Sequence, residues 1–436
     1  MVRVLCVLAL AAAPMVAQTA VGERLSLAAV VQEAIERNPE IRAAQKRFEA
    51  ALQRARGEGA LPDPMIGLGW NSSGAPWPGA GLGREPVANI GVMVTQPIPY
   101  PGKLGLRVQM ANKEAQAEWE SYQAAQLAVL SRLKQAFYRL QHVYAMQDVL
   151  ARNATVLTRM LKVTETRYSV GKAMQQEILR AQTQLSVLET QRLQFDSRRR
   201  IAEAELNAAL NRAPGTPVPP PVEAELHETL PPFEEILNFA RDNAPMLVRD
   251  QRMIERSEAA VNSARRDWYP DLAVTAGYYN MGAMPSMYMF RLDASVPIRG
   301  RKQRAAVTEQ SYALSAARRT YEATQQTLAA KLREDYEMAQ TALSLLNVYS
   351  NTLLPQSNLA VESGLATYQA GTADFMPVLQ NFMSSVEYEM SYHAQMENFH
   401  MALARLEEMS GMELTHISGK APPAVAMAAT QSGGAE

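Results

Sequence analysis

Two stretches of the sequence decide the fold: YSVGKA at residues 168–173 and YQAGTA at residues 368–373. The second stretch follows the first at an offset of 200 positions, and the same offset relates Leu179 to Leu379. A match at one fixed offset over a long distance is the signature of an internal duplication. The sequence therefore predicts one structural unit of about 200 residues that occurs twice.

Both units contain the same succession of signals: a helix, a pair of strands, a very long helix and a last helix. The first unit has them at residues 25–59, 64–97, 106–170 and up to 211, and the second at residues 233–268, 271–297, 301–354 and up to 410. The two long stretches contain neither proline nor glycine. In the second unit we expect the helical pattern to resume beyond Pro355 and to reach Tyr368.

Apolar residues in the first long stretch recur with 3-4 spacing, at Leu130, Leu133, Phe137, Leu140 and Tyr144. That spacing is typical of helices that pack side by side in a coiled coil. A helix of ~65 residues extends about 100 Å at ~1.5 Å per residue, which is longer than any small globular domain. We therefore expect a mainly helical fold with a small β part, in which long rods lie against one another.

Residues 1–20 have the pattern of a secretory signal peptide. Arg3 precedes an apolar run, and cleavage after either Ala17 or Ala20 would fit the small residues found there. The alternative is a buried N-terminal helix. The single cysteine, Cys6, lies in this leader, so we expect an exported chain without a disulfide framework, a cysteine-rich zinc site or an iron–sulfur cluster.

The joint between the two units is rich in proline, which predicts a linker at residues 214–232. The first structural repeat is then residues 21–213, and the second is residues 233–412. Each repeat has the order helix, β-hairpin, long helix, helix. Residues 413–436 are rich in alanine and glycine, and we expect them to form a disordered tail.

Charge and motif content exclude several classes of protein. The chain carries 43 Lys and Arg against 44 Asp and Glu, a formal net charge of −1. It therefore lacks the basic excess of a nucleic-acid-binding protein. The sequence also contains no phosphate-binding loop of the Walker type and no nucleophile elbow. We expect neither an enzyme nor a protein with a cofactor.

Residues 288–296 alternate between an apolar and a polar face. The apolar face carries Tyr288 and Phe290, and the polar face carries Arg291 and Asp293. This period of two is typical of a strand with one buried face. It fits a soluble sheet packed on a helix, and it equally fits an outer-membrane barrel with lipid outside and water inside.

The number of strands limits the second interpretation. Strands of ~9–10 residues are long enough to cross a bilayer when tilted, but the smallest spanning barrels have about eight strands. The sequence predicts four, and open strand edges cannot exist in lipid. A barrel would therefore be shared between protomers, with eight strands in a dimer and twelve in a trimer.

The duplicated order of motifs resembles that of the TolC-like outer-membrane efflux factor family. The residues that carry this resemblance are the two Tyr-x-x-Gly motifs at Tyr168/Gly171 and Tyr368/Gly371, the Asn38-Pro39 turn, the run Leu61–Pro64 and Gln96-Pro97. The resemblance covers residues 25–412. The run Pro99–Lys103 and the stretch Met284–Met287 look more like the heavy-metal branch of the family than the drug branch.

The resemblance implies a homotrimer with a 12-stranded transmembrane β-barrel in the outer membrane, continued across the periplasm by an α-barrel of long helices. It implies passive export, with a periplasmic adaptor protein and an inner-membrane pump of the proton-driven RND type as partners. Outer-membrane lipid would surround the barrel, and nucleic acid is not an expected partner. Heavy-metal cations such as Cu(I) or Ag(I) are the candidate cargo.

The helix breaks at the two glycines would lie at the periplasmic tips of this tube. The candidate gate and adaptor-docking residues are Tyr168, Gly171, Lys172, Glu177, Tyr368, Gly371, Thr372 and Asp374. The alternative is that these are plain hairpin turns, in which Asp374 only caps the following helix. The sequence departs from well-known family members, which have aspartates where Pro377 and Gln380 stand here.

The polar strand faces would line the lumen, and the candidate lumen-lining residues are Met93, Arg291 and Asp293. Four methionines lie in and beside the second hairpin loop, and they are candidate metal contacts: Met281, Met284, Met287 and Met289. Thioethers are soft ligands that favour Cu(I). The alternative is that these methionines are adaptable apolar fillers.

Two rival functions remain at the level of the sequence. A periplasmic coiled-coil adaptor would contain one helical hairpin flanked by split barrel segments, whereas this chain predicts a duplication and two separate strand pairs. A secreted structural coiled coil gives no reason for strands with membrane-length alternation.

Overall fold

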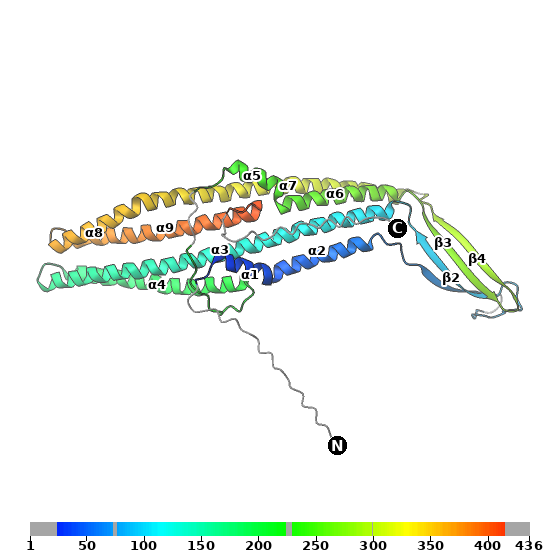
Figure 1. Ribbon diagram of the computed structural model, residues 1–436, viewed down its shortest axis with the longest axis horizontal. Helices are drawn as coiled ribbons and strands as arrows, with labels where there is room; N and C mark the ends of the chain where they lie inside the picture. The colour runs from blue at the N-terminus through cyan, green and yellow to red at the C-terminus, as the bar shows by residue number, and fades with distance from the viewer. Residues whose placement is uncertain (1–23, 73–75, 224–228, 299, 415–436) are drawn as a thin grey trace, which may run out of the picture.

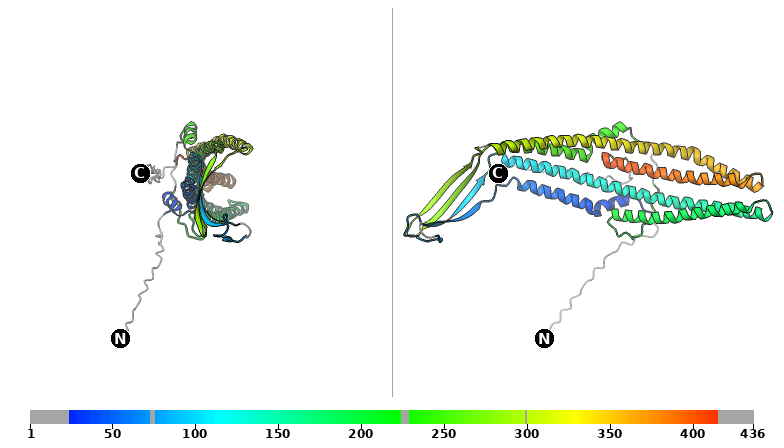
Figure 2. Two further views of the ribbon diagram at one scale, coloured as in Figure 1. Left: turned by 90° about the vertical axis from the view of Figure 1, so that its right-hand side faces the viewer. Right: turned by 180° about the vertical axis from the view of Figure 1, so that it is seen from behind.

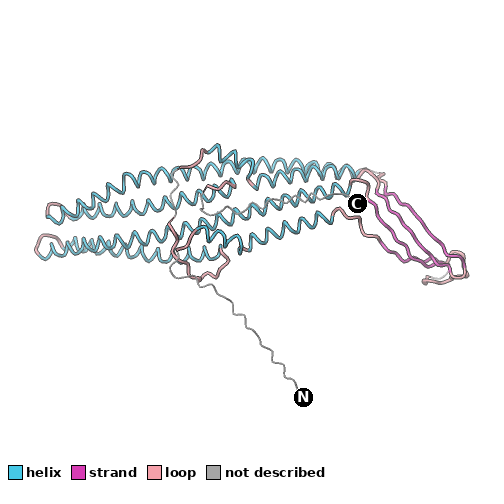
Figure 3. The backbone as a smooth tube through the Cα atoms, viewed as in Figure 1, coloured by secondary structure: helices cyan, strands magenta, loops and turns pink. Residues whose placement is uncertain are grey.

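The computed structural model describes residues 24–72, 76–223, 229–298 and 300–414. The molecule is a long rod of helices with a β-sheet at one end (Figures 1 and 3). The predicted signal peptide, residues 1–20, lies outside the described residues, and so does all but the first two residues of the predicted tail. The part of the chain that the structure describes contains no helix with the length and apolar character needed to cross a membrane.

Both halves of the chain build the same series of elements, so the predicted fold class, with its internal duplication, is confirmed. The first half forms α1 (Leu27–Arg37), α2 (Pro39–Gly57), β1 (Met65–Asn71), β2 (Asn89–Ile98), α3 (Lys103–Ser169) and α4 (Gln175–Ala209). The second half forms α5 (Phe233–Asn243), α6 (Pro245–Arg266), β3 (Asp271–Met281), β4 (Met284–Ser295), α7 (Arg301–Val348), the π-helical turn η1 (Tyr349–Leu353), α8 (Leu354–Ala370) and α9 (Phe375–Ser410).

The break between α1 and α2 follows from Asn38-Pro39. The Asn38 side-chain oxygen accepts a hydrogen bond from the backbone N–H of Glu40 at 2.8 Å, which caps α2. Pro39 fits the first turn of α2 because that position needs no N–H donor. The Asn38 amide also donates to the carbonyl of Ala209 at 3.0 Å, so the same residue joins α2 to the end of α4.

The four strands form one antiparallel sheet in the order β1-β2-β3-β4. The two hairpins are therefore joined through β2 and β3, where Val92 pairs with Tyr278. One face of the sheet is apolar and open: Ile66 is 74% exposed and Tyr288 is 80% exposed. Within the described residues, β1 and β4 each have one edge without a partner strand.

The helices pack around three separate cores and lie in a curved wall when seen along the rod (Figure 2). The tip core is farthest from the sheet and contains Val143, Met146, Leu157, Met160, Leu188, Phe375, Phe382 and Val386. A second core joins α5, α7 and α9, and a third joins α1, α3 and α4. Leu133, Phe137 and Leu140 are buried in the third core, as the 3-4 spacing predicts.

A buried ion pair fastens the two halves to each other. Lys134 of α3 and Glu407 of α9 are both almost fully buried, and the Lys134 ammonium donates to the Glu407 carboxylate. The other Glu407 oxygen accepts a hydrogen bond from the backbone N–H of Leu414 at 2.9 Å. Because an uncompensated buried charge is costly, this pair fixes how α3 and α9 lie against each other.

The long helices of the two halves differ in continuity. α3 is one helix of 67 residues. The corresponding rod of the second half is divided into α7 with 48 residues, η1 with five and α8 with 17. The sequence correctly predicts helical structure on both sides of Pro355, but it does not predict the π-helical turn that precedes this proline.

Candidate functional site

The two turns that connect α3 to α4 and α8 to α9 form the tips of the rod, at the end opposite the sheet. Both turns depend on a glycine. Gly171 has φ 74° and Gly371 has φ 83°, which is the left-handed region that glycine adopts without steric cost. The backbone N–H of Gly171 donates to the carbonyl of Tyr168 at 2.9 Å, and that of Gly371 donates to the carbonyl of Tyr368 at 3.0 Å. The two tips therefore have the same backbone turn.

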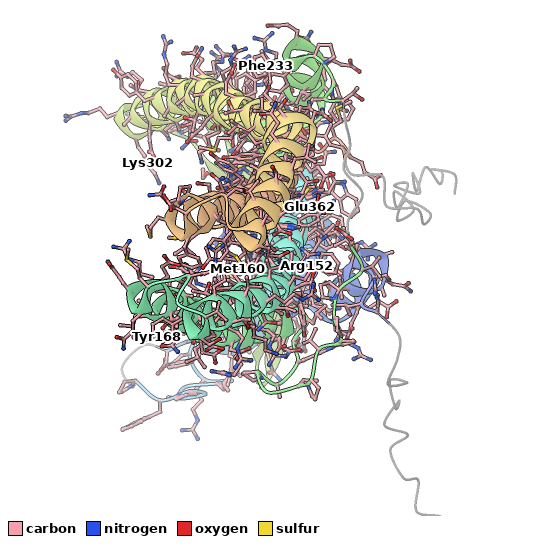
Figure 4. The ribbon with its side chains drawn as sticks, turned by 90° about the vertical axis from the view of Figure 1, so that its left-hand side faces the viewer. Arg152, Met160, Tyr168, Phe233, Lys302 and Glu362 are labelled. Atoms are coloured by element: carbon pink, nitrogen blue, oxygen red, sulfur yellow. The ribbon has the colours of Figure 1, made fainter. Side chains whose placement is uncertain are left out.

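The tyrosines that precede these glycines have different environments. Tyr168 is 47% exposed at the end of α3, where Figure 4 labels it, whereas Tyr368 is only 2% exposed. The Tyr368 hydroxyl donates to the carboxylate of Glu177 at 2.9 Å and lies 3.3 Å from Oγ1 of Thr164. Burial raises the pKa of the Tyr368 hydroxyl above its usual range, so this group remains a donor at physiological pH.

Arg167 completes the environment of Tyr368 from the first half of the chain. Its guanidinium lies 4.3 Å from the centroid of the Tyr368 ring, a cation–π distance, and it donates a hydrogen bond to the Tyr368 carbonyl. We call Thr164, Arg167, Glu177 and Tyr368 the tip latch. The latch joins the α3–α4 hairpin to the α8–α9 hairpin through contacts to the ring face and to the hydroxyl of one tyrosine.

The sequence identifies two members of the tip latch, Glu177 and Tyr368, and misses Arg167 and Thr164. Arg167 directly precedes the first Tyr-x-x-Gly motif, so its position beside a tip is visible in the sequence. Its partner is not visible, because the two residues lie 201 positions apart in the chain. Thr164 is fully buried one helical turn before Arg167.

The other predicted tip residues are exposed at the turns. Lys172, Thr372 and Asp374 all lie at the surface. Asp374 occupies the position before α9, but its side chain makes no capping hydrogen bond. The alternative in which Asp374 serves to cap this helix is therefore not supported by its geometry.

The predicted lumen-lining and metal-contact residues fall on one face of the sheet and at its end. Met93 and Met289 both pair with Gly277, so they flank one position of β3 on the same face. Arg291 donates to Asp293 at 2.9 Å on this face. Met287 also belongs to it and pairs with Tyr279.

Two glycines of the neighbouring strand β1 make room for the Met93 side chain. A Cβ atom on Gly67 would lie 3.1 Å from Met93 Cγ, and one on Gly69 would lie 3.2 Å from Met93 Cε. Met281 and Met284 pair with each other across the β3–β4 turn instead. Among the described residues, no three His, Cys, Asp or Glu side chains gather closely enough to hold a metal ion.

Comparison with known proteins identifies the family. Residues 30–212 and 236–411 match the outer membrane efflux protein family. The chain belongs to this family. No curated protein sequence matches the chain.

Solved structures of outer membrane proteins share the fold of this efflux family member. VceC of Vibrio cholerae is 17% identical, with a TM-score of 0.73 over 88% of this chain and 96% of VceC. CusC, described as forming a transmembrane channel, is 14% identical, with a TM-score of 0.76 over 89% and 92%. The outer membrane channel MtrE of Neisseria gonorrhoeae, in its open state, is 17% identical, with a TM-score of 0.69 over 88% of each chain.

Membership of the outer membrane efflux protein family bears on the rival functions. The matched family is that of outer membrane efflux proteins. A periplasmic adaptor is not favoured, because the match to the outer membrane efflux protein family covers both halves of this chain.

Proposed function

We propose that this protein is the outer-membrane channel of a tripartite efflux system and that it acts as a homotrimer. The open edges of β1 and β4 support this proposal, because three copies joined edge to edge would close a barrel of 12 strands. The exposed apolar face, which includes Ile66, Leu68, Tyr288 and Phe290, would contact outer-membrane lipid. The helical rods would extend into the periplasm.

The channel itself would be passive. An inner-membrane pump of the proton-driven RND type would supply the energy, and a periplasmic adaptor protein would dock on the tips. Tyr168, Gly171 and Lys172 of the first tip, with Gly371, Thr372 and Asp374 of the second, are exposed at the end of the rod, where such a partner would meet them.

The tip latch is the observation that carries the gating part of this proposal. Tyr368 is held by Arg167 on its ring face and by Glu177 at its hydroxyl, so the two hairpins of one protomer cannot separate without breaking both contacts. Both contacts are charge-assisted or involve a cation, which makes them stronger than neutral ones. The latch would hold the periplasmic end closed until a partner binds.

Single-channel recording tests the channel and the gate together. Purified protein in detergent is expected to have the mass of a trimer and to give small, rarely open conductance in a planar bilayer. The double variant Arg167→Ala, Glu177→Ala is expected to raise the open probability, while Lys172→Ala serves as the control at an exposed position of the same tip. A water-soluble monomer without conductance would overturn the channel function and would favour the alternative of a periplasmic adaptor.

A charge introduced into β4 tests which face of the sheet meets lipid. Leu292 lies on the apolar face and Ser295 on the opposite face. A lysine on the lipid face of a strand costs about 2–4 kcal/mol at the bilayer centre and less towards its edges, so Leu292→Lys is expected to reduce the amount of assembled trimer in outer-membrane fractions. Ser295→Lys is expected to have little effect, and equal losses would contradict this orientation of the strand.

We propose that the transported substrate is a soft heavy-metal cation, Cu(I) or Ag(I), because of the methionines on one face of the sheet. Met93 and Met289 flank Gly277 on the lumen side, and their thioethers are ligands that such cations prefer. Met287 lies further along the same face, and Met281 and Met284 lie at the turn. The lumen face would thus offer weak, successive contacts, which suit passage better than tight binding does.

Copper tolerance of an efflux-deficient bacterial host tests the cargo. The variant Met93→Leu, Met289→Leu keeps side-chain volume and removes both sulfur atoms. We expect it to lower copper and silver tolerance while conductance to potassium stays unchanged. Unchanged tolerance would remove the metal cargo and leave the channel function intact.

A further inference from the structure

A cavity of about 850 Å³ lies where the two halves of the chain meet. Its walls come from three distant parts of the sequence: residues between 138 and 152 of α3, between 217 and 223 of the predicted linker, and between 392 and 400 of α9. Arg24, the first residue that the structure describes, also lines it. The described chain therefore begins at the wall of this cavity.

The beginning of the described chain lies outside the helical wall. In the view along the rod, α1, which starts three residues after Arg24, lies on the convex side of that wall (Figure 2). In the proposed trimer the concave side would face the lumen. The cavity beside Arg24 would then face the periplasm, away from the cargo.

Backbone hydrogen bonds fix how the chain arrives at the cavity. The N–H of Leu25 donates to the carbonyl of Pro220 at 2.9 Å, and the N–H of Val222 donates to the carbonyl of Leu25 at 2.9 Å. Leu25 is thus held beside the linker like one residue of a strand. Because consecutive Cα atoms are about 3.8 Å apart, a segment that precedes Arg24 can enter the cavity at once.

Removal of the predicted leader would leave a short segment before Arg24. Cleavage after Ala17 would leave six residues, and cleavage after Ala20 would leave three. Six extended residues reach about 20 Å, so the new N-terminus stays close to the cavity in both cases. The segment carries one charged side chain, that of Glu23, and the positive α-amino group at its start.

The cavity offers an apolar wall for such a segment. Tyrosine, valine, proline and methionine side chains line much of it: Tyr138, Val218, Pro219, Pro220 and Met396. Val21, which belongs to the segment after either cleavage, has a side chain that gains free energy by leaving water for such a wall.

Glu397 supplies the cavity with a carboxylate whose charge is poorly compensated. Among the described residues its ion-pair partner is Nε2 of His142 at 3.7 Å, close to the 4.0 Å limit of such contacts. Burial raises the pKa of the Glu397 carboxyl despite the charges around it. Arg152, which also lines the cavity, is engaged by Asp148 and Glu389. An added cation beside Glu397 would therefore be favourable.

We propose that, once the leader is removed, the new N-terminal segment, which starts at Gln18 or Val21, fills this cavity and places its α-ammonium group against the Glu397 carboxylate. Capture of an N-terminal amine is a recurring mode of peptide recognition. The docked segment joins the two repeats, because α3 belongs to the first and α9 to the second. A chain that keeps its leader has a peptide group in place of this amine, so the contact forms only after processing.

Engineered disulfides test the position of the segment. The single cysteine, Cys6, lies in the leader, so the processed protein is free of cysteine. Val21→Cys, Gly22→Cys and Glu23→Cys are each combined with Met396→Cys, which lies in the cavity wall. At least one pair is expected to form an intramolecular disulfide in the oxidising periplasm, because disulfides require Cα atoms within about 7 Å.

Asn398→Cys is the matched control partner for these disulfides. Asn398 lies two residues further along α9 than Met396 and, with Met338 of α7, lines a different cavity. The three N-terminal cysteines are expected to form no disulfide with it. Absence of a disulfide from all three pairs with Met396→Cys, or equal yields with both partners, would overturn the proposal.

Acylation of the N-terminal amine tests its contact with Glu397. An α-amino group has an ordinary pKa of about 7.7–8.0, so an amine reagent at about pH 7 modifies it in preference to lysine. An ammonium held by a carboxylate keeps its proton. We therefore expect the amine of the native protein to react about tenfold more slowly than that of Glu397→Gln. Glu387→Gln changes an exposed glutamate of the same helix and is expected to react as slowly as the native protein.

Mass spectrometry of the protein purified from outer membranes reads these outcomes. Equal acylation rates in the native protein and in Glu397→Gln would overturn the contact. A chain that begins at Met1, or whose N-terminus is blocked, would also overturn the proposal. A native mass above that of the processed chain, together with a fast-reacting amine, would assign the cavity to a separate ligand. None of these readouts uses conductance, so they are independent of whether the protein is a channel.

Discussion

The two tips of the rod have the same backbone and different side-chain environments. Both turns use a glycine with positive φ and the same hydrogen bond to the preceding tyrosine carbonyl. Tyr168 nevertheless points to solvent, while Tyr368 is buried between Arg167 and Phe375. Duplication has thus kept the local geometry that the glycine requires, while the contacts of each tyrosine depend on which hairpin lies beside it.

The largest expected difference between the tips comes from truncating the tyrosines. Tyr368→Ala removes a fully buried ring, and such changes cost about 3–5 kcal/mol. Tyr168→Ala alters an exposed side chain and should change stability by less than about 0.5 kcal/mol. Thermal unfolding of the purified protein, followed by circular dichroism, measures both. Equal losses of stability would show that the two tips are equivalent after all.

Removal of Arg167 tests whether the latch depends on its cation. Arg167→Ala loses the contact with the Tyr368 ring and the hydrogen bond to the Tyr368 carbonyl, which together are expected to cost about 1.5–3 kcal/mol. Hydrogen exchange at the second tip is expected to accelerate. Arg159→Ala is the matched control, because Arg159 is an exposed arginine on the same helix, α3. Acceleration by both variants alike would assign the effect to charge alone.

The glycines provide the test in which the tips should behave alike. Gly171→Ala and Gly371→Ala each force a Cβ into the left-handed region, at a cost of about 1–2 kcal/mol. Neither added Cβ would meet an atom closer than 3.8 Å, so no clash adds to this cost. Thermal unfolding should therefore give the same loss for both variants. A much larger loss at Gly371 would mean that the latch depends on the turn itself.

The smallest expected effect isolates the hydroxyl of the buried tyrosine. Tyr368→Phe keeps the ring under Arg167 and removes the hydrogen bond to Glu177, which should cost about 0.5–1.5 kcal/mol. Tyr168→Phe has no such bond to lose. The open probability in planar bilayers is expected to rise slightly for Tyr368→Phe only. If it rises as much as for Tyr368→Ala, the hydroxyl and not the ring holds the latch.

Most of the fold can be predicted from the sequence, because its signals are local. The fixed offset predicts the duplication, glycines predict the tips, and alternation of Tyr288, Phe290 and Arg291 predicts which faces a strand presents. The central pairing of β2 with β3 cannot be predicted in this way, since no local pattern states which hairpin edges meet. The sequence indicates two separate hairpins, whereas in the structure β2 pairs with β3, so that the two hairpins form one sheet.

The candidate site could be predicted only in part, for a related reason. Tyr168 and Tyr368 occupy equivalent positions in equivalent motifs, and nothing within either motif distinguishes the buried one from the exposed one. The difference arises from Arg167 and Thr164, which reach Tyr368 across the hairpins. The π-helical turn could not be predicted from the sequence either. Gly171 follows Gly102 by 69 positions and Gly371 follows Gly300 by 71, which shows that the second rod is longer but not where the surplus is taken up.

The pairing of β2 with β3 has a consequence for synthesis. Val92 cannot find Tyr278 until the ribosome has added one complete repeat, and at about 5–20 residues per second that takes several seconds or more. During this interval the first hairpin presents an unpaired edge and an apolar face, a combination that invites aggregation. Until the second hairpin is available, the first hairpin is an isolated two-stranded unit, which is at best marginally stable in water.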